Sequence, residues 1–393
     1  MRAILFVYFL SFGIFLPYFS PFLVEQGFSS AAVGALLSAV MFAKVIGPLL
    51  LGWWVDYCGQ ILPTLRTSAL LSALLCLAIG GLMLGHAPLL GWFGLLLAFG
   101  LVWQPMLSQL DVLTLRRVGE DSHEYSAIRA WGSIGFIVSS VGLGWALDFW
   151  PTGRSLLVLL GISLSLLLLV WLLWRTPEPS VRAIETSNKT PLWPVLLRRP
   201  MLSFLTLQFL VNVAHGVYYA FYSVYLGANG YTPGVIGLLW ALGVVAEIAL
   251  FFVLPHFLRR VALSALFFLA LALMSLRWLM IGFGVESLAV LLSAQLLHAA
   301  SFGLTHAVGV TVMHQEFSGS LQARGQAVYS GLSYGGGAAL GLLLAGGLWS
   351  AVGAAASFAV MAGISLLAFG FWWQSRAMMD RRSPVNLPLA EGV

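Results

Sequence analysis

Two stretches of the chain share one pattern: GFSSAAVGALLSAVMFAK, Gly27 to Lys44, and GYTPGVIGLLWALGVVAE, Gly230 to Glu247. Each begins with a glycine, an aromatic residue and a hydroxyl residue, which is typical of a turn that starts a helix. Each then continues as a long apolar segment, and a single charge, Lys44 or Glu247, lies near the middle of that segment. Because the copies are separated by about half the chain length, two similar halves are predicted.

The composition is that of a membrane protein. Hydrophobic residues make up 60% and charged residues 8% of the 393 residues, whereas soluble domains carry about 25% charged residues. Apolar runs of about 20 residues, long enough to cross the hydrocarbon layer as helices, recur with short polar interruptions. Twelve spans are predicted: 3–24, 30–55, 64–84, 90–113, 126–148, 155–174, 201–226, 233–255, 262–283, 287–312, 323–348 and 351–373.

The predicted fold class is all-α and integral to the membrane, with two pseudo-symmetric six-helix bundles. The N-terminal bundle is expected over residues 1–174 and the C-terminal bundle over residues 201–373. A hydrophilic linker over residues 175–200, rich in Pro, Ser, Thr and charge, separates them. Residues 374–393 are expected to form a disordered tail.

The distribution of Lys and Arg predicts the orientation. With both termini in the cytoplasm, 15 of the 19 Lys and Arg residues fall in inner segments and only Arg154 in an outer loop. The net charge of +5 is then explained by basic loops that face anionic lipid, so no nucleic-acid partner is expected. Cys58 and Cys76 are expected as free thiols, and no spacing of Cys and His predicts a metal site.

A short motif follows the first copy of the repeat: Gly52-Trp-Trp-Val-Asp56-Tyr-Cys-Gly59. It resembles the Gly-x-x-x-Asp-x-x-Gly signature between helices 2 and 3 of the major facilitator superfamily of transporters. In that family the acid caps a neighbouring helix and locks the outward-facing state, so the resemblance implies a gating role for Gly52, Asp56 and Gly59. The basic residues that usually follow the acid are replaced by Tyr57 and Gln60. A plain helix-end acid is the alternative.

The fourth and fifth spans carry a second motif. Trp103-Gln104-Pro105 and Asp111 lie in the fourth span, and Arg129 opens the fifth. The interval from Asp111 to Arg129 resembles that of the lactose permease branch, in which such an acid and arginine hold substrate. An arginine among apolar residues also requires a carboxylate partner. Gln104, Asp111 and Arg129 are therefore predicted to bind substrate; a fixed structural ion pair is the alternative.

The seventh span is rich in polar and aromatic residues. Five recur at three- and four-residue steps: Gln208, Asn212, His215, Tyr219 and Tyr222. A polar helix face belongs on a cavity rather than on lipid, so these residues are predicted to bind substrate. The run from His215 to Ser223 resembles the phenylpropionate permease group of the superfamily.

Spans in the second half carry the residues predicted to couple transport to protons: Glu247, Arg277, His298 and His306. Segments 274–277 and 295–303 resemble helices 9 and 10 of the lactose permease branch. Ser301, however, stands where the proton-carrying carboxylate is found there. Glu247 is therefore the predicted proton carrier. His298 would assist it, and His306, eight residues on, would line the same path.

Lys44 and Glu247 are predicted to act together. A charge at the bilayer centre costs about 2.5 to 3.5 kcal/mol, so each requires a partner or a function. Pseudo-symmetry would place the two at matching depths, where they would form an ion pair across a central cavity. A substrate anion at Lys44 or a proton on Glu247 would break this pair, and each event would favour the other. A permanent salt bridge between the halves is the alternative.

The predicted function is secondary active transport by alternating access, driven by the proton gradient and without a cofactor. The cations Lys44, Arg129 and Arg277 outnumber Asp111 and Glu247, which favours a small organic anion such as an aromatic carboxylate, with Lys44 as a substrate ligand. Proton symport is predicted because the fifth span lacks the Gly-Pro motif often seen in drug-exporting antiporters of the superfamily. Proton-coupled sugar or nucleoside uptake and proton-antiport efflux are the alternatives. No nucleophile and base pair, phosphate-binding loop or metal cluster predicts an enzyme. The resemblance implies a monomer in the cytoplasmic (inner) membrane of a bacterium, with solute, protons and the lipid bilayer as its partners.

Overall fold

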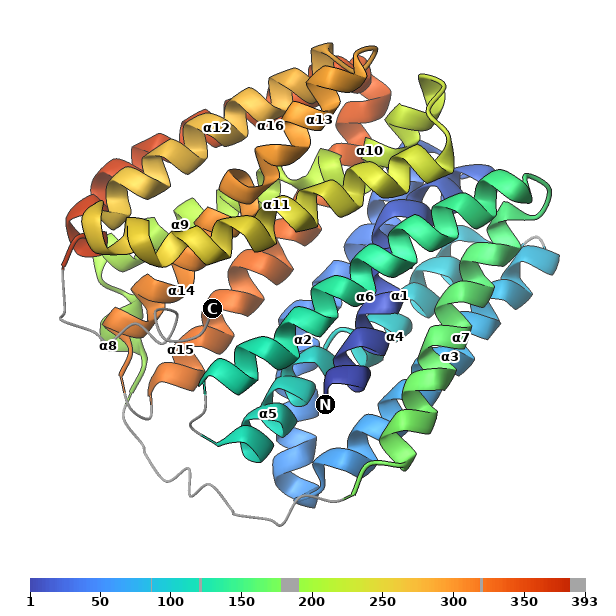
Figure 1. The fold of residues 1–393 in the computed structure, drawn as a ribbon, viewed down its shortest axis with the longest axis horizontal. Helices are drawn as coiled ribbons and strands as arrows, with labels where there is room; N and C mark the ends of the chain where they lie inside the picture. Colours follow the sequence, from blue (N-terminus) through green and yellow to red (C-terminus); the bar gives the residue numbers. More distant parts are fainter. Residues whose placement is uncertain (86, 120–121, 178–190, 319–320, 382–393) are drawn as a thin grey trace.

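The computed structural model describes residues 1–85, 87–119, 122–177, 191–318 and 321–381, and all its regular elements are helices (Figure 1). The first half forms α1 (Arg2–Glu25), α2 (Ser30–Cys58), α3 (Ile61–Leu84), α4 (Leu89–Trp103), α5 (Met106–Val118), α6 (Ser122–Phe149) and α7 (Arg154–Trp174). The second half forms α8 (Trp193–Leu196), α9 (Arg199–Ala214), α10 (Gly216–Ala228), α11 (Pro233–Arg260), α12 (Leu263–Phe283), α13 (Leu288–Leu296), α14 (Thr305–Glu316), α15 (Gln322–Tyr329) and α16 (Ala338–Met379). Two π-helical segments, η1 (Ala299–Leu304) and η3 (Ser330–Gly337), interrupt the second half.

The helices supply the predicted number of crossings. In the described residues, 11 helical segments are long and apolar enough to cross a membrane. The last of them, Arg324–Met379, has 56 residues, about 84 Å of helix, far more than the roughly 30 Å hydrocarbon layer. Gly353, with φ of 79°, interrupts it and divides it into two crossings. The all-α membrane fold is confirmed.

The structure describes only parts of the predicted linker and of the predicted C-terminal tail. Half of the predicted linker, residues 178–190, and the end of the tail, residues 382–393, lie outside the described residues. The start of the predicted tail is helical, because α16 continues to Met379. Asp380 ties this end to α12, since its carboxylate accepts a hydrogen bond from the Ser264 N–H at 2.9 Å.

The two repeated stretches have the same backbone. Gly27 and Gly230 have φ of 83° and 87°, a left-handed conformation that side chains disfavour. Ser29 and Thr232 then cap α2 and α11, each accepting a hydrogen bond from the N–H three residues on. The same turn and the same cap therefore occur in both repeated stretches.

The halves lie side by side, with α6 along α11 and α2 along α16 (Figure 1). Gly34 and Gly237, which are partners in the repeat, permit these contacts. A Cβ on Gly34 would lie 2.8 Å from the Cα of Gly346, and one on Gly237 would lie 2.9 Å from the carbonyl carbon of Ser140. Small residues thus allow close helix contact at equivalent places in both halves.

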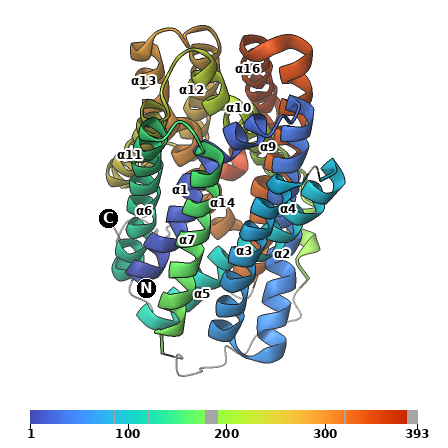
Figure 2. The same cartoon turned by 90° about the vertical axis from the view of Figure 1, so that its right-hand side faces the viewer.

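Hydrogen bonds join the halves at the end of the bundle away from the N-terminus. Figure 2 shows the N-terminus in the lower part of the view. The Tyr18 hydroxyl donates to the carbonyl of Pro233 at 3.1 Å. The Asp148 carboxylate accepts from the Thr232 hydroxyl and from the Gly234 N–H, both at 3.1 Å. These bonds close this end of the molecule.

The predicted gating motif ends α2 at the opposite end. Gly59 is the C-cap, with φ of 66°, and a Cβ on Gly52 would lie 3.9 Å from Nε2 of Gln109. Asp56 is exposed and forms no hydrogen bond or ion pair with a described residue. A gating role for the three residues stays a prediction.

Candidate functional site

The predicted pair of Asp111 and Arg129 is present. Asp111 lies on α5, which begins after the helix is interrupted at Gln104 and Pro105. Arg129 lies on α6. Nη1 of Arg129 is 2.7 Å from Oδ1 of Asp111, and the side chains are 36% and 27% exposed, respectively. This exposure leaves room for a solute to compete for the guanidinium fork of Arg129.

The polar residues of the seventh span are not on one open face. The span is broken at His215, so α9 ends at Ala214 and α10 begins at Gly216. Gln208 donates to the Thr305 carbonyl at 3.0 Å, and Asn212 donates to the Gln208 carbonyl at 2.9 Å. The prediction of a cavity-facing row is therefore corrected. Four of its members are buried in the second half: Gln208, Asn212, His215 and Tyr222.

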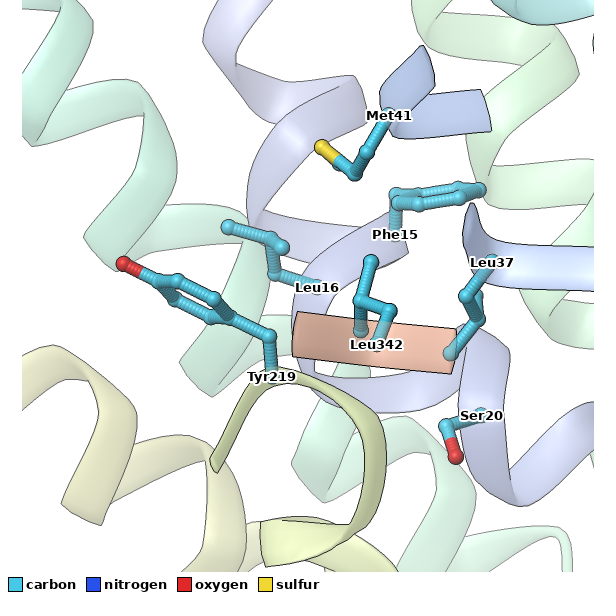
Figure 3. Close-up of a pocket in the computed structure, with 7 residues that line it drawn as sticks. All are labelled: Phe15, Leu16, Ser20, Leu37, Met41, Tyr219 and Leu342. Atoms are coloured by element: carbon cyan, nitrogen blue, oxygen red, sulfur yellow. The ribbon is translucent and has the colours of Figure 1, made fainter. Parts of the chain in front are cut away.

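Tyr219 is the member of this row that lines a pocket between the halves (Figure 3). The pocket is formed by α1, α2, α10 and α16, and its lining residues are Phe15, Leu16, Ser20, Leu37, Met41, Tyr219 and Leu342. Its volume of about 10 Å³ is close to the minimum that holds one water molecule. In this conformation the pocket is too small for an organic solute. Gln104 lies beside it, with its amide nitrogen 3.5 Å from the Met41 sulfur.

Lys44 lies where α2 meets η3 of the other half. Its Nζ is 5.6 Å from the ring centre of Tyr334, within the range of cation–π attraction. The Tyr334 hydroxyl is in turn 2.8 Å from Nδ1 of His306. A cation of the first half therefore faces a tyrosine of the second, and this tyrosine contacts a histidine.

Tyr334 is a site residue that the sequence analysis missed. A signal for it exists in the three glycines that follow it, Gly335 to Gly337, which let η3 approach α2 closely. A Cβ on Gly335 would lie 3.0 Å from the backbone nitrogen of Val45. The sequence analysis did not assign a role to the tyrosine beside them.

Glu247 pairs with a histidine. Its Oε2 is 3.9 Å from Nε2 of His298, and the side chains are 19% and 9% exposed, respectively. The predicted ion pair between Glu247 and Lys44 is not formed in this conformation, because each side chain has another neighbour.

A stack of three rings separates the two charges. The ring of Phe302 lies between those of His298 and His306, with ring centres 5.5 Å and 6.0 Å apart and planes within 1° and 4° of parallel. Glu247 contacts the His298 end of this stack, and Lys44 lies at the His306 end through Tyr334. His298 and His306 therefore lie on one side of their helix, and a shared proton path stays a prediction.

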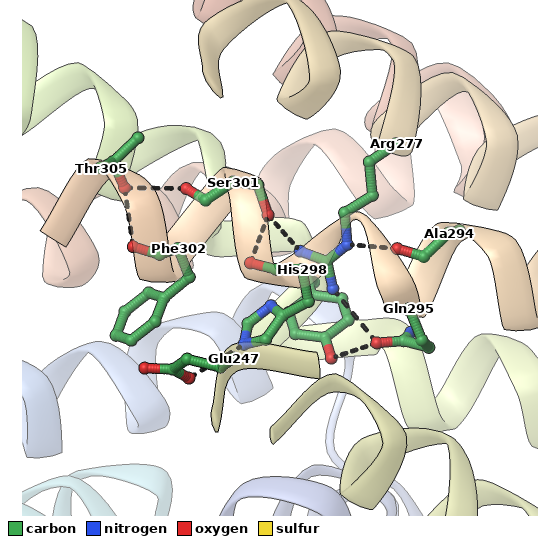
Figure 4. Close-up of polar contacts among 9 residues, drawn as sticks. Glu247, Arg277, Ala294, Gln295, His298, Ser301, Phe302 and Thr305 are labelled. Atoms are coloured by element: carbon green, nitrogen blue, oxygen red, sulfur yellow. Dashed lines mark hydrogen bonds and ion pairs between the residues drawn. The ribbon is translucent and has the colours of Figure 1, made fainter. Parts of the chain in front are cut away.

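Arg277, on α12, is fully buried in a neutral hydrogen-bonding network (Figure 4). Its Nη1 donates to the Ser301 hydroxyl at 3.0 Å, its Nη2 to Oε1 of Gln295 at 3.3 Å, and its Nε to the Ala294 carbonyl at 3.1 Å. The guanidinium carbon lies 4.3 Å from the ring centre of Tyr218. In the described part of the chain, no acidic residue lies within ion-pair distance of Arg277.

Comparisons with known proteins agree with this architecture. Residues 1–360 match the MFS_1 like family. A probable 3-phenylpropionic acid transporter of Escherichia coli is 30% identical over 350 residues, which cover 88% of this chain and 90% of that protein. A putative nucleoside transporter of the same organism is 25% identical over 357 residues, covering 87% of this chain and 82% of that protein.

The fold also matches a solved structure. The nucleoside transporter NupG superposes with a TM-score of 0.81 at 18% identity, covering 95% of this chain and 97% of that chain. At this identity the likeness concerns the fold. The chain belongs to the MFS_1 like family, and it is an integral membrane transporter of the major facilitator superfamily.

Proposed function

We propose that this transporter takes up a small organic anion, of the aromatic carboxylate class, together with protons. The observation that carries the proposal is the uneven charge where the halves meet. Asp111 already neutralises Arg129, whereas Lys44 has no acidic partner among the described residues. A solute carboxylate would supply the missing negative charge.

The surroundings of Lys44 suit a solute that carries an aromatic ring. In the structure its ammonium group faces the ring of Tyr334. An arriving carboxylate would replace this cation–π contact with an ion pair, and the ring of the solute could then pack against Tyr334. The similarity to the probable 3-phenylpropionic acid transporter supports this class of solute.

Glu247 and His298 form the proposed proton site. They are largely buried, and the stack that includes Phe302 connects them to the surroundings of Lys44. Coupling would therefore run through movement of the stack rather than through a direct Lys44–Glu247 ion pair. The π-helical η1 carries Phe302, and such segments often occur at functional sites. A shift of η1 is the proposed link between proton binding and solute binding.

The proposed state of this structure is inward-facing, in a monomer of the cytoplasmic membrane. The distribution of basic residues favours cytoplasmic termini, so the end closed by Tyr18 and Asp148 would be the outer one. Asp56, proposed to cap a neighbouring helix in the outward-facing state, would then be expected without a partner here; its lack of a hydrogen bond or ion pair with a described residue supports this proposal.

Uptake into liposomes that contain the purified protein tests the proposal. With a proton gradient directed inward, 3-phenylpropionate should accumulate, and a protonophore should abolish the accumulation. Lys44→Gln should lose both accumulation and counterflow exchange, because the carboxylate loses its anchor. Arg154→Gln, at the start of α7, is the matched control and should behave like the wild type. Equal accumulation with and without the gradient would contradict proton symport.

A nucleoside is the second candidate solute, supported by the similarity to the putative nucleoside transporter. The amide nitrogens of Gln208 and Asn212, however, already donate to backbone carbonyls, and both side chains are buried, so a nucleobase cannot reach them in this conformation. Competition decides between the candidates. Excess uridine should leave 3-phenylpropionate uptake unchanged if the carboxylate is the solute, and strong inhibition by uridine would favour the nucleoside.

A further inference from the structure

The second half contains a buried cation for which the proposed transport cycle provides no role. Arg277 has 0% of its side chain exposed, and a guanidinium carries five N–H donors. The structure provides acceptors for three of these five N–H groups, and all three acceptors are neutral oxygens. A buried charge normally has a counter-charge, because leaving it uncompensated is costly.

The polar atoms around Arg277 include further donors without acceptors. Nε2 of Gln295, the hydroxyl of Tyr222 and Nε1 of Trp278 are buried, and none has a hydrogen-bond partner among the described residues. Each of these side chains is 0% exposed. Buried donors of this kind are rare in folded proteins, and each requires an explanation. A surplus of donors beside a cation is the environment that an anion requires.

The orientation of the Gln295 amide is determined by its neighbours. Its Oε1 accepts from Nη2 of Arg277 at 3.3 Å and from the Tyr218 hydroxyl at 3.2 Å (Figure 4). Reversing the amide would turn its NH₂ group towards two donors, so Nε2 remains the free end. Tyr222 lies beside this group, because the centre of its ring is 4.8 Å from that of Tyr218.

Aromatic rings cover the faces of the guanidinium. The ring centres of Tyr218 and Trp278 lie 4.3 Å and 4.6 Å from its central carbon. Such stacking leaves the edge of the guanidinium, with its N–H groups, as the place where a further ligand can bind. A compact anion fits an edge better than a bulky one.

We propose that Arg277, Gln295 and Tyr222 bind a monovalent anion inside the second half. Two sources share this chemistry: a chloride ion, and the carboxylate of the transported solute. The second source rests on the proposed function, whereas the first does not. In both cases the anion supplies the negative charge that the described part of the chain does not place beside Arg277.

Thermal unfolding of the full-length protein in detergent tests the site. Sodium chloride or sodium 3-phenylpropionate is titrated at constant ionic strength, with HEPES as the bulky counter-anion. Saturation by the correct probe should raise the unfolding midpoint by on the order of 3 °C. Arg277→Gln should abolish this rise.

A second variant keeps the test informative if Arg277→Gln fails to fold. Gln295→Glu has the same shape as the wild type, preserves both acceptor contacts and places a carboxylate against Arg277. It should unfold at or above the wild-type midpoint without added anion, and it should not respond to chloride. In a Lys44→Gln background, which removes the proposed solute contact at Lys44, it should not respond to 3-phenylpropionate either. Responses to both probes that Gln295→Glu leaves unchanged in this background, or no response of the wild type to either probe, would overturn the proposal.

Lys44→Gln separates the two sources. A chloride response that persists in Lys44→Gln and is absent in Gln295→Glu identifies a chloride site. A 3-phenylpropionate response that persists in Lys44→Gln, and is lost when Gln295→Glu is added to that variant, assigns the site to the solute. If proton-driven uptake fails while an Arg277-dependent chloride response remains, the proposed transport function is wrong and the anion site stands.

Discussion

The two copies of the repeat have the same backbone, but their charges have different surroundings. Lys44 of the first copy faces Tyr334, which belongs to the other half, whereas Glu247 of the second copy faces His298 of its own half. Both π-helical segments in the described chain lie in the second half, and they carry Phe302 and Tyr334. The duplication therefore preserved the positions of the charges, and the irregular helices of one half determined their partners.

Removing each charge in turn should produce the largest contrast between the copies. Glu247→Gln should lower gradient-driven accumulation by about two orders of magnitude, because the proton carrier is lost. Its counterflow exchange should remain within a few-fold of the wild type, whereas Lys44→Gln should lose exchange as well. Radiolabelled solute in liposomes provides both measurements. If Glu247→Gln accumulates solute as well as the wild type does, Glu247 is not the proton carrier.

The paired glycines test whether the two contacts between the halves are equivalent. Gly34→Val and Gly237→Val each place atoms against the backbone of the opposite half, so each should prevent closure of the Tyr18 and Asp148 end. We expect transport to fall about tenfold in both, since overpacking a close contact costs about 1 to 3 kcal/mol. Thiol labelling of a cysteine placed at Ser140 should increase in both variants. An effect in only one would show that the contacts are not equivalent.

Changes at Tyr334 separate its ring from its hydroxyl. Tyr334→Phe keeps the ring near Lys44 and removes the hydrogen bond to His306, which should lower apparent affinity a few-fold, in line with about 1 kcal/mol per hydrogen bond. Tyr334→Leu removes the ring as well and should have the larger effect on aromatic solutes. Uptake rates at varied solute concentration measure this. Equal effects of the two variants would mean that the ring has no role.

The smallest expected difference lies in the helix caps. Ser29→Ala should cost about 1 kcal/mol, the usual effect of losing an N-cap. Thr232→Ala should cost more than Ser29→Ala, because Thr232 also donates to Asp148 across the halves. Thermal unfolding of the two variants side by side checks the order. If Ser29→Ala is the more destabilising change, the Asp148 contact adds nothing to stability.

One part of the candidate site, the pair of Asp111 and Arg129, could be predicted from residue types and their spacing in the sequence. Asp111 and Arg129 pair as expected, because an arginine near apolar residues needs a carboxylate and the chain offers one nearby. The row from Gln208 to Tyr222 was not predictable, because its regular spacing conceals the break at His215. The predicted ion pair between Lys44 and Glu247 is not formed in this structure, because the ring stack that contains Phe302 lies between the two side chains. The sequence does not reveal this stack.

The amino-acid sequence by itself determined the class of protein, the twelve crossings and the duplicated turns at Gly27 and Gly230. It could do so because lipid leaves the backbone few alternatives to the helix, so hydropathy and turn residues carry most of the information. Only the tertiary structure decided which charges meet. Partners depend on the rotation of each helix and on the π-helical segments η1 and η3, and helical periodicity in the sequence does not reveal either.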